Sequence, residues 1–234
     1  MRNISLEICC GGIEDVNSVA DLAIDCIELN SALELGGLSP SISSLKLARN
    51  LYTGKLVTMV RSMPGGFNYS ENELATMYRD AEAFLENGSD GIVFGFLDEN
   101  GYIDIDVLKD FVALAKKYHK EFIFHKAFDY VINQEKVIQK LVDLKVDRIL
   151  MMGNSDLDTC AKNIRHLINN YGNKIEILAG GGLSEDNIAN FINVSGVKMV
   201  HGTFKESRYD DISSSSRYYV SRTRVEKVLE LIKK

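Results

Sequence analysis

Charged and imidazole side chains stand inside several of the most apolar segments of the chain. They are Glu7, Glu28, Arg61, His125 and His201. Such groups are costly to bury in a strand unless they are paired or hydrogen-bonded. Carboxylates and imidazoles that meet in one cavity suit general acid–base catalysis. We therefore expect these five side chains to converge on one catalytic site, and an ionic network inside the core is the alternative.

Two further features extend this candidate site. Asp129 follows the segment FIFHKAF at 122–128 and would orient His125 or add a carboxylate. The segments AGGG and HGT provide glycines at two apolar segment ends, where backbone N–H groups can approach an anion closely. Ser184 would cap a following helix whose N-terminus favours anions. The predicted anion-binding residues are Gly181, Gly182, Gly202 and Thr203, with a plain tight turn as the alternative.

The elements that must position these residues alternate regularly. Amphipathic stretches, such as 71–87 and 104–118, separate the apolar segments and predict helices. The apolar segments predict strands at about 4–9, 26–30, 56–61, 91–96, 122–128, 148–153, 174–180 and 199–203. Eight strand–helix units favour a single (β/α)8 TIM-like barrel, with a doubly wound open sheet as the alternative. In a barrel, the carboxyl ends of the strands meet at one mouth, and the candidate residues should gather there.

Local signals support these boundaries. Ser70 and Glu73 form a predicted capping box before the helix at 71. Asp25, Asp90 and Asp147 each stand two residues before an isoleucine at the start of a strand. Turns that lead from a helix into a strand lie on the barrel face concerned with stability. We expect these three aspartates to be structural.

Bulk properties predict one soluble domain over 1–234. The 234 residues are 45% hydrophobic and 26% charged, with a net charge of -6 spread along the chain. This balance argues against binding to nucleic acid or to an anionic membrane. The chain enters its first strand without a signal peptide, and its four cysteines are expected to be thiols. These features predict a cytoplasmic location, and self-association through the outer helices stays open.

One polar segment interrupts the pattern. Residues 205–221, KESRYDDISSSSRYYVS, follow the last strand and contain four consecutive serines. Loops of this composition are often mobile. We predict a flexible polar loop over about 205–221 before a last helix near 222–233, and a flap over the barrel mouth is the alternative.

Several motifs together resemble the CutC copper-homeostasis family. The matching segments are ISLEICCGG, IELNSALELGGLSPS, GFNYSENE, DGIVFGFLDENGYID, FHKAFD, EILAGGG and HGT. The resemblance implies a TIM-like barrel, a cytoplasmic location and a role in copper handling. Asn30 stands where the family pattern usually has cysteine, and Lys126 where it usually has arginine. Met63 stands where a second arginine is common. The departure at Asn30 weakens the case for a copper site built from cysteines.

Copper handling requires soft ligands, and Cu(I) prefers thiolates and thioethers with imidazole also accepted. Side chains alternate along a strand, which turns Cys9 inward with Glu7 and turns Cys10 toward the helices. The predicted metal ligands are Cys9 and Cys10, with Cys9 paired either with a histidine or, after local rearrangement, with Cys10. The same alternation is expected to point Lys126 out of the barrel. The alternative function is an enzyme that acts on a small anionic or phosphorylated metabolite at the mouth.

Overall fold

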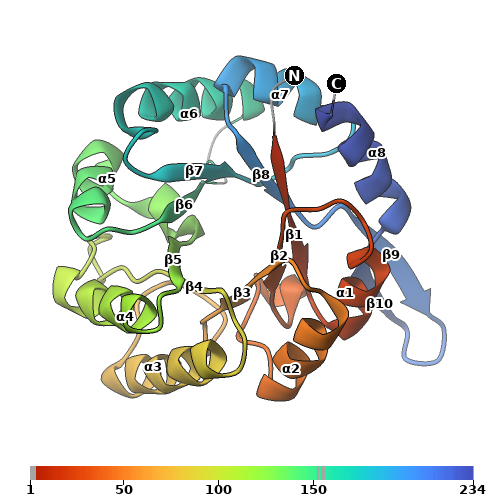
Figure 1. Ribbon diagram of the computed structural model, residues 1–234, viewed down its shortest axis with the longest axis horizontal. Coiled ribbons are helices and arrows are strands. Elements are labelled where there is room, and N and C mark those ends of the chain that lie inside the picture. Colours follow the sequence, from red (N-terminus) through yellow and green to blue (C-terminus); the bar gives the residue numbers. More distant parts are fainter. Residues whose placement is uncertain (1–3, 152, 154–155, 234) are drawn as a thin grey trace.

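Eight parallel strands close into a barrel that helices surround (Figure 1). The computed structural model describes residues 4–151, 153 and 156–233. The barrel strands are β1 (Ser5–Cys10), β2 (Cys26–Leu29), β3 (Lys55–Met59), β4 (Gly91–Phe94), β5 (Glu121–Phe124), β6 (Arg148–Met151), β7 (Glu176–Ala179) and β8 (Met199–Gly202). Each strand pairs with the next, and β8 returns to pair with β1. The predicted (β/α)8 barrel is confirmed, because an open sheet would leave β1 and β8 as unpaired edges.

The helices follow the predicted amphipathic stretches. The α-helices are α1 (Ile13–Val19), α2 (Ile42–Leu51), α3 (Glu71–Glu86), α4 (Ile105–Lys117), α5 (Gln134–Asp143), α6 (Leu157–Tyr171), α7 (Ile188–Ser195) and α8 (Arg222–Ile232). Two short 3-10 helices are η1 (Leu33–Leu35) and η2 (Lys126–Tyr130). The capping box of Ser70 and Glu73 is present at the start of α3. Within the described ranges, no helix has both the length and the apolar character needed to cross a membrane.

The core has two layers, as strand alternation requires. On β1, Ile8 and Cys10 belong to the apolar layer between the barrel and its helices. The barrel interior has its own apolar cluster, whose members are Cys26, Val57, Met59, Val93, Ile123, Leu150, Leu178 and Met199. Glu7 and Cys9 alternate with the outer-layer residues and therefore point into the interior.

Three aspartates tie neighbouring strands together in the same way. The carboxylates of Asp25, Asp90 and Asp147 accept hydrogen bonds from the backbone N–H groups that open β1, β3 and β5, at 2.8, 3.0 and 2.8 Å. The backbone N–H of each aspartate donates in return to the carbonyl of the same partner residue. Each aspartate thus closes a paired contact on the amino-terminal face of the barrel. Their predicted structural role is confirmed.

Replacing Asp90 with alanine is expected to lower the free energy of unfolding by about 1–3 kcal/mol. The change leaves the Leu56 N–H without its acceptor and removes ion pairs to Arg49 and Lys120, both at 2.8 Å. Urea unfolding followed by circular dichroism measures the loss. The matched control is Asp106→Ala, whose side chain is 91% exposed and whose removal should cost about 0.5 kcal/mol or less. Equal losses in both variants would contradict the prediction.

The segment predicted to be a flexible loop over about 205–221 forms a β-hairpin instead. Its strands are β9 (Lys205–Asp210) and β10 (Ser215–Val220), paired antiparallel. Most of their side chains are exposed, so no apolar alternation marks these strands in the sequence. The backbone N–H of Val220 donates to Asp15 at 2.9 Å and fastens the hairpin to α1. The hairpin projects outward beside α1 and α8 (Figure 1) and does not form a flap over the barrel centre.

Candidate functional site

A cavity of about 450 Å³ opens at the carboxyl ends of the barrel strands. We call it the mouth cavity. It lies where the sequence predicts the candidate residues to gather, at the end of the barrel that carries function in this fold. Its lining includes Cys9, Glu28, Asn30, Met59, His125, Lys126, His201, residues 181–184, residues 202–205 and Arg224.

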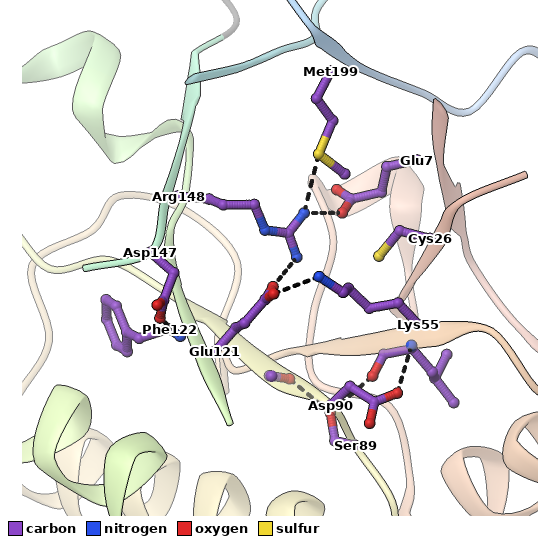
Figure 2. A network of polar contacts seen from close by, with 12 residues as sticks. Glu7, Cys26, Lys55, Ser89, Asp90, Glu121, Phe122, Asp147, Arg148 and Met199 are labelled. Carbon is purple, nitrogen blue, oxygen red and sulfur yellow. Dashed lines mark hydrogen bonds and ion pairs between the residues drawn. The ribbon is translucent and has the colours of Figure 1, made fainter. Parts of the chain in front are cut away.

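A buried ionic network lies inside the barrel (Figure 2). Glu7 is 1% exposed, and its Oε2 lies 2.7 Å from an Arg148 guanidinium nitrogen. The other end of the guanidinium lies 2.9 Å from Glu121, which also pairs with Lys55 at the barrel rim. Burial alone would raise the pKa of Glu7, but Arg148 and His201 outweigh it and lower the pKa to about 2. Glu7 is therefore a fixed carboxylate at neutral pH.

His201 connects this network to the mouth cavity. Its Nδ1 lies 2.9 Å from Glu7 Oε1, and its ring also interacts with Cys9. Burial would lower the pKa of His201, but Glu28, Cys9 and Glu7 raise it well above its ordinary value. The Glu7 carboxylate thus fixes the orientation of the imidazole. Two of the residues predicted to converge, Glu7 and His201, are in direct contact.

Cys9, Glu28 and Asn30 form a second group on neighbouring strands. The Cys9 thiol donates to Glu28 Oε1 at 3.7 Å, and the Asn30 amide donates to the same oxygen at 2.6 Å and to Cys9 Sγ at 3.4 Å. Burial and the nearby Glu28 raise the pKa of Cys9 to about 11, so the thiol is protonated at neutral pH. Burial also raises the pKa of Glu28. Glu28 Oε2 and Asn30 Oδ1 are buried and have no hydrogen-bond partner among the described residues.

Cys9, Glu28 and His201 could hold a metal ion. One donor atom from each lies within 4.8 Å of the donor atoms of the other two, and all three residues are buried. The set combines a thiol, an imidazole and a carboxylate. Cys10 does not line this cavity, because its side chain packs in the outer apolar layer. The structure therefore brings together Cys9 and His201 but not the predicted ligand pair of Cys9 and Cys10.

Arg61 does not join the carboxylates as expected. Its guanidinium donates to backbone carbonyls of Gly36, Gly37 and Gly65 at 3.3, 3.2 and 2.6 Å. These contacts bind two loops together beside the cavity. Asp129 lies in η2 and does not line the mouth cavity, and its charge adds to burial in raising the pKa of Cys160. Among the carboxylates and cations predicted to converge, Arg61 and Asp129 are thus set apart from Glu7 and Glu28.

His125 and Lys126 lie side by side in the wall of the mouth cavity. The prediction that Lys126 points out of the barrel is wrong. Strand β5 ends at Phe124, and the chain turns into η2, so the alternation that places side chains along a strand no longer applies. The turn begins at His125, whose Nδ1 accepts a hydrogen bond from the Ala127 N–H at 3.2 Å.

The glycine segments also contribute to the lining of this cavity. Gly181, Gly182, Gly202 and Thr203 all line the mouth cavity, as the prediction of an anion site requires. The helix expected to begin after Ser184 begins later, at Ile188, so its N-terminus lies further along the chain. Lys205 and Arg224 add positive charge to the same lining, and sequence reasoning missed both. Arg224 is already paired with Glu185 at 2.9 Å, which leaves Lys205 as the cation of this wall without an ion pair among the described residues.

Arg148 is the main residue that sequence reasoning missed. It begins β6 and is 2% exposed, although its guanidinium carries a full charge. The signal was present, because the segment RILMMG places an arginine at the start of an apolar strand, just as LVTMVR places Arg61 at the end of one. The sequence could not show which of the two arginines meets Glu7.

Comparison with known proteins identifies close relatives. The CutC family model matches residues 4–206. A family protein CutC from Treponema denticola is 38% identical over 202 residues, which cover 86% of this chain and 81% of that protein. A second one, from Vibrio vulnificus, is 34% identical over 204 residues, which cover 87% and 82%.

Solved structures give the same result. The crystal structure of CutC from Streptococcus agalactiae, put forward as a copper homeostasis protein, has a TM-score of 0.80 and 31% identity. The match covers 86% of this chain and 98% of that chain. The 3-hexulose-6-phosphate synthase of Salmonella typhimurium has a TM-score of 0.66 at 15% identity and shares the barrel fold alone. That match covers 98% of this chain and 99% of the synthase chain.

Proposed function

The chain belongs to the CutC family, and from that premise we propose that it is a cytoplasmic copper homeostasis protein that binds Cu(I) in the mouth cavity. The convergence of Cys9, Glu28 and His201, with donor atoms within 4.8 Å of one another, is the observation that carries this proposal. All four cysteines are free thiols, in keeping with a reducing compartment.

The donor set fits Cu(I) in part. Cu(I) prefers thiolate and accepts imidazole, which Cys9 and His201 supply. Met59 lines the same cavity and offers a thioether, another soft donor. Glu28 is a harder ligand that Zn²⁺ also accepts. The preference for Cu(I) over Zn²⁺ therefore rests on the sulfur atoms of Cys9 and Met59.

The surrounding residues prepare the ligands. Glu7 holds His201 through Nδ1, which orients the ring and raises its basicity as a ligand. To bind a metal, Cys9 must lose its thiol proton, and His201 must lose the second ring proton that its raised pKa retains. The Glu28 carboxylate accepts the hydrogen bond of the thiol, and its raised pKa favours uptake of the thiol proton.

The test is a competition titration of fully reduced protein against a calibrated Cu(I) chelator, with a parallel titration of Zn²⁺. We expect one Cu(I) per chain and weaker retention of Zn²⁺. Failure to compete with the chelator would contradict the proposal. Binding of several ions per chain would also contradict it, since that result indicates scattered thiol contacts.

A second candidate function is catalysis on a small anionic metabolite. The observation in its favour is the wall of Gly181, Gly182, Gly202 and Thr203, with Lys205 beside it. Backbone N–H groups of glycine-rich turns and a nearby cation are typical of phosphate sites in barrels.

Inorganic phosphate is expected to raise the midpoint of thermal unfolding of the apo protein. Phosphate bound only to the folded state at about one hundred times its Kd would add about 2.7 kcal/mol of stability. Differential scanning fluorimetry with phosphate, against sodium chloride at equal ionic strength, measures the shift. An equal response to chloride and phosphate would count against an anion site.

A further inference from the structure

The side-chain amine of Lys126 lies in the wall of the mouth cavity. It is neither one of the proposed copper ligands nor part of the ionic network inside the barrel. The residue is half-buried and borders two recesses, the mouth cavity and a groove beside Arg61. Its Nζ donates to the Gly36 carbonyl at 3.2 Å, and the Arg61 guanidinium lies 3.3 Å from the same oxygen. No carboxylate of the described residues lies within ion-pair distance of this amine.

These surroundings favour the neutral form of the amine. Burial and the neighbouring Arg61 guanidinium lower the pKa of Lys126, and the acidic groups around it, Glu28 foremost, only partly offset them. A lysine next to another cationic group and partly withdrawn from water is an activated nucleophile. An arginine–lysine pair that shares one carbonyl acceptor therefore activates the lysine amine more than it stabilises the fold.

His125 adds a hydrogen-bond donor to the same wall. It is 1% exposed, and Nδ1 accepts from the Ala127 N–H, so in the neutral ring the proton is on Nε2. Burial lowers the pKa of His125 to about 3, which keeps the ring neutral at physiological pH. Nε2 is buried and has no hydrogen-bond partner among the described residues. His125 lines the mouth cavity, and a ligand oxygen that reached Nε2 from there would satisfy this donor.

We propose that Lys126 forms an imine with a small anionic carbonyl compound bound in the mouth cavity. His125 Nε2–H donates to the carbonyl oxygen, and the glycine segments at 181–182 and 202–203 with Lys205 receive the anionic group. The anionic part of this ligand rests on the second candidate function above. The covalent step does not rest on copper binding.

The atoms of the step balance without an oxidant or reductant. The Lys126 nitrogen, having lost its extra proton to water, attacks the carbonyl carbon and forms a C–N bond. The carbonyl electron pair moves to oxygen, and a proton passes from the nitrogen to that oxygen to give a neutral carbinolamine. The hydroxyl then departs as water with a proton taken back from the solvent, and the nitrogen lone pair forms the protonated C=N bond.

The test traps the imine in the full-length protein. Reduced apo protein is incubated with D-glyceraldehyde 3-phosphate and sodium cyanoborohydride, digested, and mapped by mass spectrometry over time. We expect Lys126 to be modified at least about tenfold faster than exposed lysines such as Lys109, because the bound anionic group holds the carbonyl beside an amine whose pKa is lowered. Uncharged D-glyceraldehyde should modify Lys126 more slowly, because it lacks the anionic group.

Three variants sharpen the result. Lys126→Arg keeps the charge and should abolish the fast modification, whereas Lys117→Arg, at a lysine whose side chain is 65% exposed, should leave imine formation at Lys126 in place. Cys9→Ser should also leave it in place, which separates this proposal from copper binding. The comparison of modification rates among the lysines of the parent protein needs no variant, so it stands even if a variant fails to fold. Modification of Lys126 no faster than Lys109 would overturn the proposal, and equal rates with both aldehydes would overturn its anionic part.

Discussion

Replacing Arg148 with methionine is expected to lower the free energy of unfolding by about 3–5 kcal/mol. The change removes the guanidinium that lies 2.7 Å from Glu7 and leaves a carboxylate inside the barrel. Because Glu7 is 1% exposed, water cannot replace the lost partner. Urea unfolding at neutral pH, followed by circular dichroism, measures the effect.

The double variant Glu7→Gln, Arg148→Met separates the ion pair from packing. It should lose less stability than the sum of the two single variants, because neither Glu7 nor Arg148 is then left buried without the other. The matched control is Arg222→Met. Arg222 pairs with Asp21 at the surface, with side chains 43% and 69% exposed, and should contribute about 1 kcal/mol or less. A cost for Arg148→Met no greater than for Arg222→Met would show that the buried pair does not hold the barrel interior.

The Cys9→Ser variant is expected to weaken Cu(I) binding by more than about 100-fold. Residues that only orient a ligand account for about 10–100-fold, so loss of the thiolate itself should exceed that range. The serine keeps the size of the side chain and leaves Glu28 and His201 in place. Competition against a Cu(I) chelator at fixed pH measures the affinity ratio.

Cys10→Ala is the matched control for this prediction. Cys10 is the next residue on the same strand and is fully buried, but it packs in the outer apolar layer. Its loss should leave Cu(I) affinity unchanged apart from any general loss of stability. If both variants bound Cu(I) as the parent does, Cys9 would not be a ligand. If both lost affinity equally, the cause would be damage to β1 and not the loss of a ligand.

The alternation of strands and helices in the sequence determined the barrel, and the glycine motifs marked one wall of the mouth cavity. Apolar strands that alternate with amphipathic helices can bury both of their faces only in a helix-covered parallel sheet. Alternation inside β1 correctly placed Cys9 in the interior and Cys10 under the helices. The repeated aspartates before even-numbered strands were correctly assigned to structure, since their position on the amino-terminal face follows from chain order alone.

The tertiary structure alone decided which charges meet. Glu7 and Arg148 are separated by 141 positions, and their contact exists because the closed barrel brings β1 and β6 to face the same interior. Arg61, an equally plausible partner by sequence, lies beyond the end of β3 and donates its hydrogen bonds to loop carbonyls. Lys126 enters the cavity because β5 ends two residues before it. Periodicity fixes side-chain direction only within a regular strand, so partners across the barrel and residues in the turns at its mouth depend on closure and loop geometry.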